Sequence, residues 1–188
     1  MIDSITEAHH RQALEDEWAA RAQRAYELGF EYERIYHGCG QAVLAAVLET
    51  LERFDAAAFE AATALAGGLG LSGDCTCAAM TAAALAMGMV YPRRRSCFDA
   101  DRENKYRCFS MVQRLRERFV QRYGSVICHD IHRHQMGRAF DLRLEAERQA
   151  FEAAGAHEDK CTSVVALAAQ WAVEEIGKER MRDLLEGG

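Results

Sequence analysis

The 188-residue sequence has very little proline and no long apolar run. Pro92 is the only proline, and the β-branched residues that favour strands are scattered rather than clustered. Alanine is plentiful, so long stretches are free to form helices. No stretch of about 18 apolar residues occurs, and we therefore expect no transmembrane helix. Together these features predict an all-α fold, a helical bundle of about six to seven helices.

Two further absences narrow the class of protein. The net charge is −6, and an acidic chain is poorly suited to binding nucleic acid through its phosphates. The first 18 residues, MIDSITEAHHRQALEDEW, lack the apolar segment of a secretory signal. No P-loop pattern is present. We therefore expect a cytoplasmic protein that does not bind nucleic acid.

Apolar spacing and capping residues predict a series of helices. Asp55 is expected to cap one helix, and Gly124 and Gly155 are expected to stop two others. We expect a single α-helical domain, with residues 1–30 as an N-terminal extension and residues 31–188 as the cysteine-motif core. The predicted helices span residues 4–28, 39–54, 56–66, 75–90, 99–123, 138–154 and 159–185, with a shorter element starting at Ser125. The predicted core contains Val43, Leu44, Val47, Leu85, Phe109, Val112, Leu167 and Trp171.

Cysteine is the residue type that stands out. There are seven, and an odd number in a chain without a secretory signal argues against a purely structural disulfide framework. Four predicted helix starts carry cysteine in the first turn: Cys39, the pair Cys75 and Cys77, Cys128, and Cys161. A helix N-terminus has unpaired N–H groups and a positive dipole end, which favour a thiolate and lower its pKa. A thiolate both attacks disulfides and binds metal.

The sequence gives less support for a functional role of the other candidate residues. Free cysteines often only fill space in a core, and we interpret Cys97 and Cys108 as structural or incidental. Cys128 and His132 are four residues apart, so they can meet on one helical face as metal ligands. Histidines also occur at solvated helix ends, and His132 is open to that interpretation as well.

Four cysteine motifs resemble one known family. They are Cys39-Gly40-Gln41-Ala42-Val43-Leu44, the loop Gly67–Gly73 leading to Cys77, Gly124-Ser125-Val126-Ile127-Cys128-His129-Asp130-Ile131, and Lys160-Cys161. In order and spacing they resemble the C_GCAxxG_C_C family of putative redox-active proteins over about residues 30–175. Here Ala78, Ala82 and Ala83 stand where that family usually has glycines, and Cys75 is an additional thiol. The resemblance implies redox or metal chemistry on an α-helical domain, with Cys39, Cys77, Cys128 and Cys161 as the characteristic cysteines.

Three functions remain open at this point. The first is a metal or iron–sulfur protein for electron transfer, with those four cysteines as ligands and Cys75 and His132 as further ones. The second is a metal-free thiol–disulfide protein, in which Cys39 could pair with Cys77 and Cys128 with Cys161. The third is a helical binding module with inert thiols. Part of the family is similar to the N-terminal region of split-Soret cytochromes, but covalent c-type haem needs Cys-x-x-Cys-His, which is lacking.

We predict that Cys39, Cys77, Cys128 and Cys161 come together in space, with Cys75 near enough to join them. Grouped thiolates repel one another, so a bound cation, a cluster or disulfide pairing must compensate. An empty and fully reduced site would instead raise the thiol pKa values. A redox partner protein and a homodimer are further expectations, the latter because small-residue helix faces and the helix over residues 4–28 leave apolar surface to bury.

Overall fold

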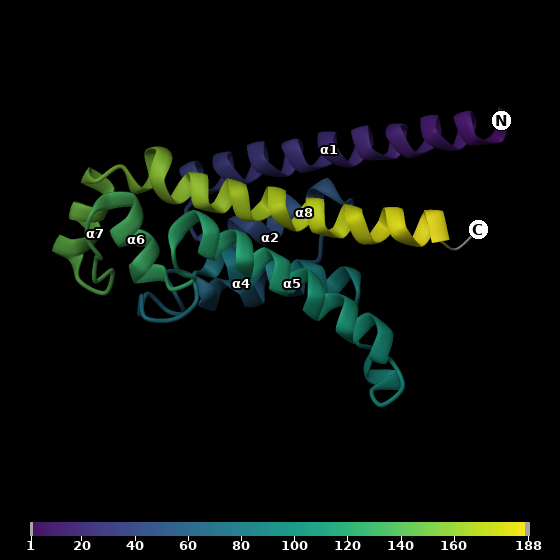
Figure 1. Ribbon diagram of the computed structural model, residues 1–188. Coiled ribbons are helices and arrows are strands. Elements are labelled where there is room, and N and C mark those ends of the chain that lie inside the picture. The colour runs from purple at the N-terminus through teal and green to yellow at the C-terminus, as the bar shows by residue number, and fades with distance from the viewer. Residues whose placement is uncertain (1, 187–188) are drawn as a thin grey trace.

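The computed structural model describes residues 2–186, and eight α-helices make up most of that span (Figure 1). They are α1 (Ile2–Tyr36), α2 (Cys39–Thr50), α3 (Ala56–Ala61), α4 (Ala78–Val90), α5 (Arg102–Tyr123), α6 (Cys128–Met136), α7 (Glu145–Ala153) and α8 (Cys161–Glu186). Two short 3₁₀ turns, Ala62–Leu65 and Arg95–Cys97, and one π-helical turn, Ala156–Lys160, complete the helical structure of these residues. The all-α prediction is confirmed, although six to seven helices was slightly too few.

Two long helices organise the bundle. In Figure 1, α1 and α8 run antiparallel and side by side, so that both chain ends lie at the same end of the molecule. Helices α2 and α4 pack against each other and against α8, and α5 packs against α4 and α8. The short helices α6 and α7 lie at the opposite end from the chain termini. Within residues 2–186, no helix is both long and apolar enough to cross a membrane.

The first helix is longer than predicted. We expected it to loosen at Gly29, but α1 continues to Tyr36. Gly29 faces α8, where an added Cβ would lie 3.3 Å from the Ala166 Cα and the Ala169 Cβ. Gly177 on α8 lies in the same way against the Trp18 ring. The two glycines therefore serve close helix packing, which outweighs the cost of glycine inside a helix.

Other predicted boundaries differ in informative ways. Asp55 caps α3 as predicted, since its side chain accepts a hydrogen bond from the Ala58 N–H at 2.8 Å. Gly124 and Gly155 follow α5 and α7 with φ of 75° and 81°. The helix predicted over residues 75–90 begins only at Ala78, and the one predicted over 138–154 is confined to Glu145–Ala153. The backbone before each of these two helices is used instead to build the site described below.

The predicted core is only partly right. Val43, Leu44 and Val47 are fully buried, and Val112, Leu167 and Trp171 are partly buried. Leu85 and Phe109 are exposed, at 39% and 51%, so both were wrong as core residues. Helix α5 turns Arg107, Arg114 and Arg118 toward α8, and this orientation places Phe109 on the outer face. Hydrophobic periodicity indicated that α5 has an apolar face, but it could not determine which residues at the edges of that face are buried.

Candidate functional site

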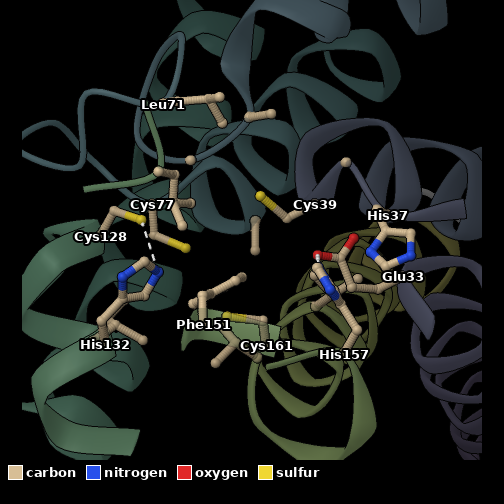
Figure 2. Close-up of a pocket in the computed structure, with 18 of the residues that line it drawn as sticks. Glu33, His37, Cys39, Leu71, Cys77, Cys128, His132, Phe151, His157 and Cys161 are labelled. Carbon is tan, nitrogen blue, oxygen red and sulfur yellow. Dashed lines mark hydrogen bonds and ion pairs between the residues drawn. The ribbon is translucent and has the colours of Figure 1, made fainter. Parts of the chain in front are cut away.

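A cavity of about 250 Å³ lies at the end of the bundle away from the chain termini, and four cysteines line it (Figure 2). Each comes from the start of a different helix. Cys39 is the first residue of α2, Cys77 directly precedes α4, Cys128 is the first residue of α6, and Cys161 is the first residue of α8. The structure therefore brings together thiols that are up to 122 positions apart in the sequence (161 − 39).

A short antiparallel contact brings Cys77 and Cys128 into the cavity. Thr76 forms an isolated β-bridge with Ile127. The Cys77 N–H donates to the Val126 carbonyl at 2.8 Å, and the Cys128 N–H donates to the Cys75 carbonyl at 3.0 Å. Cys77 is buried and lines the cavity, whereas Cys75, two residues earlier, is exposed. Cys75 does not line the cavity.

The glycine-rich loop allows this close approach. Gly68 has φ of 70°, and a Cβ there would lie 2.7 Å from the Cys128 Cβ. Gly73 has φ of 77°, and a Cβ there would overlap the His129 ring, 1.8 Å from Nε2. The Gly73 carbonyl accepts a hydrogen bond from the His129 N–H at 2.8 Å. Both positions need glycine, because the backbone is left-handed and no space remains for a side chain.

Cys128 and His132 meet on one face of α6, as their spacing predicts. The Cys128 Sγ lies 3.5 Å from the His132 Nε2. His132 is 3% exposed, and its Nδ1 has no hydrogen-bond partner among the described residues. Burial lowers the pKa of His132 to about 4, with a smaller contribution from His129. The ring is therefore neutral at neutral pH, which is the form of histidine that binds metals.

The four thiols do not behave as exposed helix-start thiols would. Burial raises the pKa of Cys77 to about 11 and also raises the pKa of Cys39, Cys128 and Cys161 well above the ordinary value of a thiol. Glu33 adds to the increase at Cys39 and Cys161. The prediction that helix dipoles lower these pKa values is therefore wrong for the cavity without a bound cation, because loss of water outweighs the dipole.

The remaining cysteines lie elsewhere. Cys97 is in the 3₁₀ turn before α5, with its Sγ 4.0 Å from an Asp101 carboxylate oxygen. Cys108 is partly buried on α5 against α4. Neither lines the cavity.

Sequence reasoning missed five charged or titratable side chains in the cavity wall: Glu33, His37, Arg148, Glu152 and His157. Glu33 is 2% exposed, and its Oε2 has no hydrogen-bond partner among the described residues. Burial alone would lower the pKa of His157, but Glu33 and Glu152 raise it above its ordinary value. Two signals could have found three of these residues. Glu33 and His37 are one turn apart just before Cys39, and His157 is one turn before Cys161.

The fold and the site define an all-α protein with a buried cavity lined by four thiols from four helix starts. The chain matches the family described as putative redox-active protein (C_GCAxxG_C_C) over residues 37–175, a range that includes all four cysteines. It belongs to that family. Comparison with curated proteins and with solved structures found no match.

Proposed function

We propose that this protein carries a metal centre, most consistently an iron–sulfur cluster, on Cys39, Cys77, Cys128 and Cys161, and that it transfers electrons. The observation that carries the proposal is the convergence of these four thiols on one cavity. Four thiolates match the ligand number of an iron–sulfur cluster and of tetrahedral zinc. When bound, a cluster would supply one-electron transfer, while the chain holds it and limits its contact with water.

The spacing of the thiols favours a cluster over a single ion. Zinc–sulfur bonds of about 2.3 Å place tetrahedral ligands roughly 3.8 Å from one another. Among the described residues, no set of three potential ligands within 4.8 Å of one another includes a cysteine. Thiols arranged around a cavity rather than converging on one point suit a centre with several metal ions, each bound to its own thiolate.

Burial also favours a metal centre over thiol–disulfide exchange. Exchange needs an accessible thiolate, whereas Cys77 and Cys128 are buried and the pKa values of all four thiols are raised. Metal binding needs no such access by a partner protein, because the positive charge of the metal displaces the thiol protons directly. His132 adds a neutral imidazole next to Cys128 and could act as a ligand or orient that sulfur.

The neighbouring cysteines Cys75 and Cys77 provide a matched test. Iron and sulfide are measured in wild type, Cys77→Ser and Cys75→Ser after purification without oxygen. We expect the wild type and Cys75→Ser to be coloured with equal iron content, and Cys77→Ser to lose it. Equal iron in both variants would contradict the proposal.

The two alternatives give different outcomes in the same experiment. A colourless wild type whose free-thiol count falls on mild oxidation would favour thiol–disulfide chemistry. A colourless protein with unreactive thiols would favour a helical binding module. Either result would replace the metal proposal.

The assembly state and the location stay predictions. A homodimer would have apolar side chains to cover on α4 and α5, where Leu85, Tyr106 and Phe109 are exposed. Light scattering that gives a monomer at micromolar concentration would contradict it. A redox partner protein would exchange electrons with the centre. A cytoplasmic location would keep the seven free cysteines reduced.

A further inference from the structure

A second group of potential metal ligands lies in the wall of the thiol cavity and contains no cysteine. Donor atoms of His37, Glu152 and His157 all lie within 4.8 Å of one another. The His157 Nδ1 is 2.7 Å from a Glu152 carboxylate oxygen. The rings of His37 and His157 meet edge to face with their centroids 3.8 Å apart. Two imidazoles and one carboxylate are therefore already gathered at one point.

Irregular backbone places the two histidines there. His37 follows α1 with φ of 61°, a left-handed conformation that is uncommon for residues other than glycine. His157 lies in the π-helical turn that follows Gly155 and precedes α8. Such turns are rare and frequently occur at functional sites. Two unfavourable local conformations are thus maintained where the two rings meet.

Glu33 supplies the second observation that indicates a ligand. Its carboxylate is 2% exposed, and its Oε1 lies 3.6 Å from the His157 Nε2. Its other oxygen has no hydrogen-bond partner among the described residues. Figure 2 shows Glu33 next to His157 and His37, between them and Cys39. His157 therefore has one carboxylate at each ring nitrogen.

We propose that His37, Glu152 and His157 bind a divalent transition-metal cation, with Glu33 as the positioning residue for His157. His157 would bind through Nδ1, beside Glu152, and its Nε2–H would donate to Glu33. A metal-bound histidine usually donates its other N–H in this way to a carboxylate, which fixes the tautomer. A bound cation would add positive charge near the buried carboxylate of Glu33, whose ionic contact among the described residues is to His157.

The ligand types define the class of ion. Two imidazoles with one carboxylate suit Zn²⁺ or Fe²⁺, whereas Mg²⁺ and Ca²⁺ prefer oxygen ligands. His37 and Glu152 are exposed, so water can complete the coordination of the ion. Three protein ligands with an open position are typical of catalytic rather than structural zinc sites. The site does not depend on the cysteine centre.

Cobalt titration tests the proposal, because Co²⁺ bound to thiolate shows a charge-transfer band that Co²⁺ bound to nitrogen and oxygen lacks. Metal-free full-length protein is titrated with Co²⁺ in the presence of Mg²⁺, as wild type, Glu152→Gln and His157→Gln. Glu158→Gln and His10→Gln are the matched controls, since both residues are exposed and lie outside the group. Glu152 is itself exposed, so its variant is expected to fold, which circular dichroism checks.

We expect one Co²⁺ per chain without the thiolate band. Its affinity should fall at least about tenfold in Glu152→Gln and His157→Gln and stay within about twofold in the two controls. The proposal is overturned if no Co²⁺ binds, or if every bound Co²⁺ shows the thiolate band. Unchanged affinity in Glu152→Gln and His157→Gln would equally overturn it, leaving His157 and Glu152 as a simple ion pair.

Discussion

Buried carboxylates occur in two regions of this molecule, with opposite surroundings. Where α5 packs against α8, Glu175 and Glu179 are each 1% exposed, and five cationic side chains surround them. These are Arg107, Arg114, Arg118, Lys178 and Arg182. At the thiol cavity, Glu33 is equally buried, but its one ionic contact is to His157 at 3.6 Å among the described residues.

The difference separates structural from functional burial of charge. A buried carboxylate that is fully paired stabilises the folded chain, or at least does not destabilise it, without needing anything further. A carboxylate, an imidazole and four thiols buried with few partners cost stability unless a ligand binds them. We therefore interpret the α5–α8 ion pairs as structural, whereas the cations proposed above would compensate the polar groups at the cavity end. The following predictions test this contrast.

The largest effect on the free energy of unfolding is expected from Arg114→Met. Arg114 bonds both Glu175 and Glu179, so its loss leaves two buried carboxylates undercompensated. We expect the free energy of unfolding to fall by about 3 kcal/mol. Chemical denaturation measures it, with Arg116→Met, an exposed neighbour on α5, as the control that should change by less than about 0.5 kcal/mol. A loss no larger than that of the control would show that the ion pairs contribute nothing to stability.

A smaller loss of stability is expected when the pH is lowered. Burial would raise the pKa of Glu175, but Lys178 and Arg114 hold it below its ordinary value of 4.5. A lowered carboxyl pKa in the folded state contributes stability above the ordinary value, and that stability is lost as pH falls through the folded pKa. The stability of wild type should therefore fall more steeply than that of Glu175→Gln between about pH 5 and pH 3. Parallel curves would contradict this assignment.

The smallest effect on stability is expected from Glu33→Gln. The change removes a buried charge that has little compensation, so the free energy of unfolding should change by less than about 1 kcal/mol, in either direction. Denaturation of metal-free protein measures it alongside Arg114→Met. A loss as large as that of Arg114→Met would mean that Glu33 belongs to a structural ion pair, and would remove the contrast between the two regions.

Much of the local structure could be predicted from the sequence. Asp55 caps α3, and Gly124 and Gly155 follow their helices with left-handed backbone, because capping and glycine conformations depend on neighbouring residues alone. The cysteine spacing and its motifs also indicated which four thiols would gather. Cys39, Cys128 and Cys161 begin helices, and Cys77 directly precedes one, close to where local pattern placed them.

Only the tertiary structure decided the burial, the neighbours and the pKa values of these residues. Cys75 and Cys77 differ because distant segments that line the cavity cover Cys77 and leave Cys75 exposed. Glu33, His37 and His157 become neighbours because α1 and the turn before α8 end at the same cavity. The thiol pKa values rise rather than fall because several separate segments together exclude water. Local sequence determines where a helix starts. The burial of a side chain at that start depends on every segment that covers it, so it cannot be read from the spacing of neighbouring residues.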